Sequence, residues 1–195
     1  ALSKDGKIGF KISGQYFAGT DWKFEDPIEL QANNGVNPRT YDLEKFMGEA
    51  RLDFRPADDT EIILSAGGSN ADIIEMTGIG AAQADGWKYH YLQGRVRYRN
   101  WFGQVFYNKS DAGDTRLLRT NNPIVDKSTM TVFQLQHSPT LGERQRFTYG
   151  GDLLLTRPKT EGTINGSHEN DDDVNEYGVY LQSETSLSDR VDLIV

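Results

Sequence analysis

Apolar and polar residues alternate along most extended segments of this 195-residue chain. In residues 176–184, Tyr177, Val179 and Leu181 occupy every second position, and the pattern returns in residues 191–195 after a short polar turn. Consecutive side chains of a β-strand point to opposite faces, so this spacing predicts a hairpin with one apolar and one polar face.

The same alternation recurs through the chain and predicts about nine strands. They cover residues 7–18, 49–55, 61–69, 87–99, 101–108, 130–137, 146–156 and the two halves of 173–195. Long polar connections, the first with a helical turn near residues 28–32, alternate with short turns; the long ones cover residues 19–47, 70–86, 111–128 and 158–172. The predicted fold is therefore an all-β, antiparallel up-and-down meander whose long loops all emerge at one end. No change of composition along the chain indicates a domain boundary.

Charge and composition exclude several classes of protein. A net charge of -8 disfavours a nucleic-acid partner, because binding phosphates requires clustered Lys and Arg. The chain has no cysteine, which excludes disulfides, a thiol nucleophile and a cysteine-ligated zinc site. No apolar run approaches the roughly 20 residues of a membrane-spanning helix.

Alternation alone fits both a soluble sandwich, which hides its apolar face, and a membrane barrel, which turns that face to lipid. The expected gathering of long loops at one end favours the barrel. So does the mixed charge of the polar face, which carries Glu49, Arg51, Asp53, Arg55, Gln93, Arg95 and Arg97. Aromatic residues also lie near predicted strand ends: Phe54, Tyr98, Trp101 and Phe147 at the short-turn end, and Tyr16, Trp87 and Tyr107 at the other. Two aromatic belts at the membrane interfaces would have this arrangement.

Three stretches resemble the β-barrel of TonB-dependent outer-membrane receptors. They are GFKISGQYFAGTDWKFEDP at residues 9–27, DTRLLRTNNPIVDKS at residues 114–128 and EYGVYLQSETSLSDRVDL at residues 176–193. The last resembles the family's recurring pattern of a Tyr-x-Gln-x-Glu strand, a Leu-Ser-Asp turn and a further apolar strand. This motif is loose, so the three stretches carry the resemblance together.

The resemblance implies a barrel of about 22 strands with an N-terminal plug, located in the bacterial outer membrane. Its partners would be outer-membrane lipid, the TonB complex through the plug, and a small-molecule or glycan ligand such as a metal chelate or cobalamin. Neither a plug, a TonB box nor a closing strand is recognisable in the sequence. We therefore interpret residues 1–195 as one partial β-barrel domain, an internal fragment that follows the plug.

The resemblance also implies that the long loops capture the ligand. The candidate ligand-binding residues in or beside these loops are Trp22, Asp26, Trp87, Arg116 and Arg119. The protein is expected to be a transporter and not an enzyme, because no nucleophile, base and orienting group come together in the sequence. No cofactor is expected either.

Metal binding has weak support in the sequence. His90, His137 and His168 are far apart, and none has a partner at metal-ligand spacing. Asp171, Asp172 and Asp173 are candidate oxygen ligands for a divalent cation, but their segment does not match the twelve-residue calcium loop. A solvated acidic loop is the preferred interpretation.

Two alternatives remain open at this level. One is a secreted soluble β-sandwich or jelly roll that binds carbohydrate, with Trp22, Trp87 and Trp101 as stacking residues. The other is a passive porin, which would share the barrel wall but have no plug. A sandwich would pack the face of Ile8 and Ile12 against a second sheet.

Overall fold

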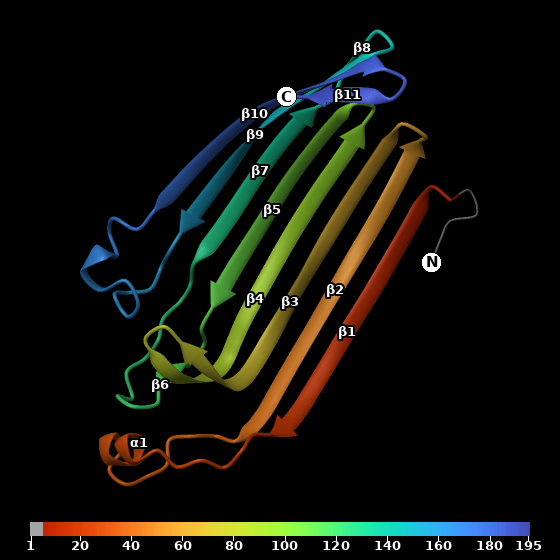
Figure 1. Ribbon diagram of the computed structural model, residues 1–195. Coiled ribbons are helices and arrows are strands. Elements are labelled where there is room, and N and C mark those ends of the chain that lie inside the picture. The colour runs from red at the N-terminus through yellow and green to blue at the C-terminus, as the bar shows by residue number, and fades with distance from the viewer. Residues whose placement is uncertain (1–5) are drawn as a thin grey trace.

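The computed structural model describes residues 6–195, which form one antiparallel sheet (Figure 1). Nine strands follow one another across it: β1 (Ile8–Thr20), β2 (Asp42–Ala57), β3 (Thr60–Thr77), β4 (Gly80–Tyr98), β5 (Trp101–Asp111), β7 (Thr129–His137), β9 (Gln145–Arg157), β10 (Val174–Ser188) and β11 (Val191–Ile194). Two short strands, β6 (Arg116–Leu117) and β8 (Thr140–Leu141), pair with β4 and β9. The helix α1 (Pro27–Ala32) and a 3-10 turn (Gly166–His168) lie in connections. The predicted all-β meander is confirmed, and this sheet does not close into a barrel.

The predicted long loop at residues 70–86 is wrong. Strands β3 and β4 continue through it to a tight turn at residues 78–79. The register shifts between Ala71 and Ile73, where the amide of Gly86 donates to the Asp72 carboxylate at 2.5 Å. Such a bulge interrupts the period-two pattern and bends the strands. The sequence of the hairpin tip therefore resembles that of a loop.

Cross-strand register assigns each side chain to one face of the sheet. One row on the apolar face joins Leu64, Val105 and Phe133 through consecutive strand pairs, and parallel rows lie on either side of it. The same partners place Arg51 and Gln93 together on the opposite, polar face. The alternation in the sequence therefore becomes two chemically distinct surfaces of the folded sheet.

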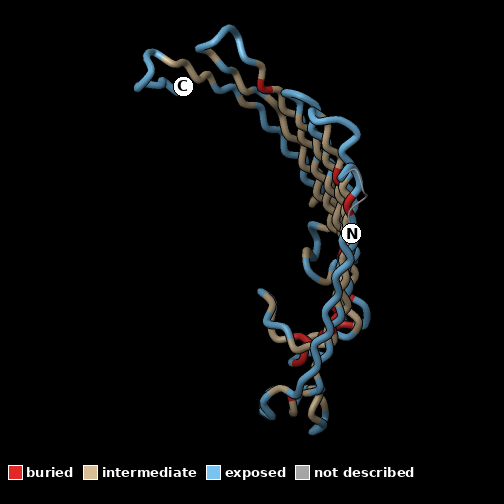
Figure 2. Tube along the Cα trace, turned by 90° about the vertical axis from the view of Figure 1, so that its right-hand side faces the viewer, coloured by how far each residue is buried: buried red, intermediate tan, exposed pale blue. Residues whose placement is uncertain are grey.

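The polar face is the less exposed of the two. In β2, exposed residues on the apolar face alternate with half-buried residues on the polar face. Leu52 is 41% exposed, whereas the side chain of its neighbour Asp53 is 15% exposed. The sheet is an arc in edge view (Figure 2). Side chains converge on the concave side of an arc, so the exposure difference indicates that the polar face is concave.

Residues 6–195 contain one sheet only, so no second sheet is present in this part of the chain to cover the apolar face as a sandwich requires. On that face Ile12 is 77% exposed and Val179 is 91% exposed. No helix within the same residues is long and apolar enough to cross a membrane.

Fully buried apolar residues are concentrated at the long-loop end of the sheet. Ala82, Ala84, Ala112, Leu118 and Ile124 are almost completely inaccessible, and all lie in the β3–β4 tip or the following loop. The hydrophobic core of the described residues is therefore built largely by connections that pack on one another. Small alanines at the hairpin tip give Leu118 room to pack there.

Candidate functional site

Three segments form a packed structure that we call the outer loop assembly: residues 21–41, the hairpin tip 78–86 and the loop 112–128. Backbone hydrogen bonds connect the last two, since the amides of Leu118 and Asp114 donate to the carbonyls of Ala81 and Asp85 at 2.9 Å. Strand β6 also pairs with the tip. The assembly is consequently held by backbone hydrogen bonds as well as by side-chain packing.

Within the first segment, residues 21–41, a buried ion pair joins Arg39 to Glu29 of α1. The Arg39 guanidinium donates to both carboxylate oxygens of Glu29 at 2.6 and 2.7 Å, and Glu29 is 1% exposed. The guanidinium also lies over the Phe24 ring. The bidentate hydrogen bonds with Glu29 raise the pKa of Arg39, which favours the charged guanidinium.

Side-chain amides connect this segment to the other two. Asn33 donates to the carbonyl of Leu118 at 2.9 Å, and the amide of Thr40 donates to the Gln83 side chain at 2.8 Å. Gln83 is buried although it lies in a strand. Each buried polar group named here has a partner, as a rigid loop structure requires.

Asp26 caps α1 and joins it to the loop 112–128. Its carboxylate accepts from the Ile28 amide at 2.8 Å and from the Arg119 guanidinium at 2.9 Å. The hydrogen bond from Arg119, followed by the one from the Ile28 amide, lowers the pKa of Asp26. Two of the residues predicted to bind ligand thus bind each other.

Gly113 is required where the loop 112–128 approaches the hairpin tip. Its φ is +59°, and a Cβ atom there would lie 2.3 Å from the carbonyl oxygen of Asp85. Only glycine both adopts a positive φ without strain and has no Cβ atom, so this position sets how closely the loop approaches β4.

A second ordered loop covers residues 158–173 around the Glu169 carboxylate. That carboxylate accepts from the Thr160 hydroxyl and from the amides of Thr160, Glu161 and Gly162. These hydrogen bonds lower the pKa of Glu169 to about 2, and the one from the Thr160 hydroxyl has the largest effect. The loop is joined to the outer loop assembly through the amide of Val125, which donates to Thr163 at 2.9 Å.

This loop is expected to loosen in acid. A carboxyl pKa lowered from 4.5 to about 2 stabilises the folded loop fully above about pH 4.5, and that stabilisation is lost as the pH falls toward 2. Hydrogen exchange of the Gly162 amide should accelerate over this window relative to that of the Val105 amide within the sheet. In the Glu169→Gln variant, the acid-dependent acceleration of Gly162 exchange should disappear. An unchanged profile in that variant would contradict the role given to Glu169.

Neither a family model, a curated protein nor a solved structure matches this chain.

The structure distributes the predicted ligand-binding residues unevenly. Asp26, Arg116 and Arg119 lie in the outer loop assembly, where Arg116 donates to the Pro38 carbonyl at 3.4 Å. Trp22 also belongs to this assembly and is 91% exposed.

Trp87 lies within a strand, as predicted for residues 87–99, and not in one of the loops that were expected to capture the ligand. It lies in β4 on the polar face, and its indole N–H donates to Ser110 at 3.2 Å. It therefore does not belong to an aromatic belt on the apolar face. The three tryptophans also do not come together as a stacking site. Trp101 lies in β5 on the apolar face, and its partner Tyr98 is at the opposite end of β4 from Trp87.

Two of the three acidic residues proposed as cation ligands have protein partners. Asp172 accepts from Asn165 at 2.5 Å, and Asp173 pairs with Arg157 at 3.3 Å. Within the described part of the chain, no three His, Cys, Asp or Glu side chains are grouped to hold a metal ion.

Sequence reasoning missed two cross-strand bridges on the polar face. The Tyr91 hydroxyl donates to Glu49 at 2.8 Å across the intervening strand, where a Cβ atom at Gly67 would lie 2.5 Å from the tyrosine ring. Tyr180 reaches Gln136 at 2.9 Å over Gly150 in the same way. Each glycine makes space for a ring that lies flat on the sheet. The signal in the sequence was a glycine inside a predicted strand.

At the short-turn end, an aromatic row crosses the apolar face. Tyr98, Trp101, His137 and Tyr149 are successive cross-strand partners. The Trp101 and His137 rings stack at 4.0 Å, and His137 Nδ1 lies 2.8 Å from the Tyr149 hydroxyl. This row gives one edge of the apolar face both ring faces and polar atoms, a composition suited to an apolar–aqueous boundary.

Proposed function

We propose that this chain forms part of the wall and outer loops of a TonB-dependent receptor, a transmembrane β-barrel of the bacterial outer membrane. Its function is the uptake of a scarce ligand, and its role is transport, not catalysis. In this proposal the apolar face contacts lipid, the concave polar face lines the lumen, and a plug connects the barrel to the TonB complex.

The inverted burial of the sheet is the observation that carries the proposal. A water-soluble sheet exposes its charges and covers its apolar side chains, whereas here Leu52 is more exposed than Asp53. The polar face also carries ion pairs between neighbouring strands, among them Arg55 with Glu61 at 3.0 Å and Arg97 with Glu61 at 3.2 Å. Lipid outside and water inside satisfy both faces.

The size and position of the apolar band support the same proposal. From Ile8 to Tyr16 the band extends about 26 Å along β1, or about 20 Å along the membrane normal for a strand tilted by about 40°. This is close to the roughly 25 Å of a barrel's apolar band.

The band also shifts between strands. In β4 the apolar band does not reach the cross-strand row of Tyr16, because Lys88 occupies that row. At the short-turn end of the sheet the band extends to Trp101, one row of the apolar face beyond the row of Ile8. Strands tilted in a barrel wall need such a stagger to keep their apolar residues level with the membrane.

Ordered connections at one end fit the capture of a ligand. The outer loop assembly and the loop around Glu169 both lie at that end, while the turns at residues 58–59, 99–100 and 189–190 at the other end are short. Rigid loops lose little conformational entropy when they bind a ligand.

Lipid contact by the apolar face is the test of this proposal, measured as quenching of Trp101 fluorescence by brominated lipid with Trp87 as the internal control. A passive porin shares the wall, so saturable ligand binding in the absence of a gradient distinguishes a receptor from it.

A further inference from the structure

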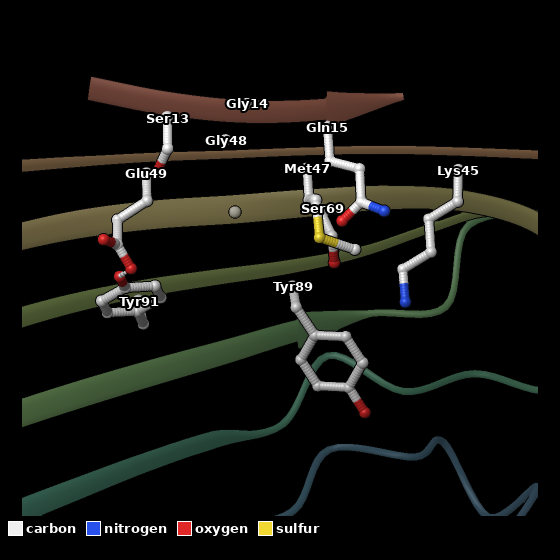
Figure 3. Close-up of a pocket in the computed structure, with 11 residues that line it drawn as sticks. Ser13, Gly14, Gln15, Lys45, Met47, Gly48, Glu49, Ser69, Tyr89 and Tyr91 are labelled. Atoms are coloured by element: carbon white, nitrogen blue, oxygen red, sulfur yellow. Dashed lines mark hydrogen bonds between the residues drawn. The ribbon is translucent and has the colours of Figure 1, made fainter. Parts of the chain in front are cut away.

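A hollow of about 440 Å³ lies on the polar face close to the outer loop assembly (Figure 3). It is formed by three adjacent cross-strand rows, which contribute Ser13, Gln15, Lys45, Met47, Glu49, Ser69, Tyr89 and Tyr91. A neighbouring hollow of about 350 Å³ shares Lys45, Ser69 and Tyr89 and adds Trp87. Both volumes lie in the range of small-ligand sites, about 300–1,000 Å³.

Aromatic rings form one side of this surface. Trp87, Tyr89 and Tyr91 alternate along β4 and so share its polar face. The Trp87 and Tyr89 rings are nearly parallel, at 18°, with centroids 6.5 Å apart. Rings in direct face-to-face contact would be about 3.5–4 Å apart, so these two are displaced sideways and leave ring surface uncovered.

The rings are held in place by groups at their edges. The Trp87 indole N–H is fixed by Ser110, and the Tyr91 hydroxyl is fixed by Glu49. Tyr91 therefore lies flat over Gly67 while Tyr89 stands beside it and is 46% exposed.

Unpaired hydrogen-bonding groups form the other side. Within residues 6–195, the side chains of Gln15, Lys45 and Ser69 and the Tyr89 hydroxyl have no hydrogen-bond or ion-pair partner. Gln15 and Lys45 project toward the same space as the Tyr89 ring (Figure 3). An amide, a hydroxyl and an ammonium group beside open ring faces can bind a ligand that has apolar faces and a hydroxylated rim.

We infer that this surface is a binding site for a neutral oligosaccharide. Pyranose rings present C–H faces that pack on aromatic rings, and their hydroxyl groups exchange hydrogen bonds with amides and hydroxyls at the edge. Lys45 disfavours a cationic ligand, while Glu49 and Glu75 in the two hollows disfavour a polyanionic one. The inference rests on the proposed function in one respect: the polar face must line a lumen that solutes enter.

The test uses the whole protein in detergent with every tryptophan except Trp87 replaced by Phe. The probes are the linear hexasaccharides of starch, cellulose, xylan and mannan, together with an iron–catecholate complex. We expect one hexasaccharide to shift the Trp87 emission saturably. The Tyr89→Ala variant should weaken this binding about tenfold or more, as loss of an aromatic anchor does. Tyr177→Ala, on the apolar face, should bind as the parent does.

The inference would be overturned by no response to any of the four hexasaccharides, or by equal binding of the sugar by Tyr89→Ala and the parent. A response to the iron–catecholate complex alone would also overturn it and assign the surface to an aromatic anion. Lipid quenching of Trp101 is measured independently of sugar. Failure of the sugar site with lipid contact intact would therefore leave the proposed function standing.

Discussion

Replacing Phe133 by Arg is expected to lower the free energy of unfolding in lipid vesicles by about 2–4 kcal/mol, the cost of a cationic side chain near the middle of a barrel's lipid face. Phe133 lies in the central row of the apolar face, between Val105 and Leu153. No carboxylate lies in this row beside it. The measurement is reversible denaturant unfolding from vesicles.

The neighbouring residue provides a matched control. Gln134 follows Phe133 in β7, points to the polar face and is the cross-strand partner of Asp152. Gln134→Arg adds the same charge next to a carboxylate in water, so its effect should stay below about 1 kcal/mol. Equal effects of the two substitutions would contradict the assignment of the faces.

Removing the Arg39 guanidinium is expected to destabilise the outer loop assembly by about 3–5 kcal/mol, because Arg39→Ala leaves the Glu29 carboxylate buried without its partner. Hydrogen exchange of the Leu118 amide, which donates to Ala81, reports this directly. Exchange there should accelerate while exchange of the Val105 amide in the sheet stays unchanged.

Two controls separate loss of the pair from loss of a surface charge. The double variant Glu29→Leu, Arg39→Leu removes both charges and should recover most of the stability that Arg39→Ala loses. Lys127→Ala breaks the exposed pair with Glu161 and should cost less than about 1 kcal/mol. If Arg39→Ala behaved as Lys127→Ala does, the assembly would not depend on the buried pair.

The strands and their faces could be predicted from the sequence because period-two alternation is a local property. Residues such as Ile12 and Val105 have the orientation that their position in the pattern predicts. The helical turn predicted near residues 28–32 is present as α1, with Asp26 as its cap. Each of these features depends on neighbours in the chain.

Features that depend on distant segments could not be predicted in this way. The alanines of the hairpin tip have no period-two pattern because loop residues such as Leu118 cover them, so residues 70–86 were predicted as a loop. The bridge from Tyr91 over Gly67 joins three strands, and no local pattern encodes it. The candidate binding surfaces were therefore the least predictable part.

Lipid is expected to cover the apolar face of the sheet, and quenching of tryptophan fluorescence by brominated lipid measures this contact. Trp101 lies on that face in the aromatic row, whereas Trp87 lies on the polar face. Two variants are reconstituted in vesicles, each keeping only Trp101 or only Trp87 and with the other tryptophans replaced by Phe. Lipid brominated near the glycerol should strongly quench Trp101 and leave Trp87 almost unchanged. Equal quenching of the two, or none for Trp101, would contradict lipid contact by the apolar face.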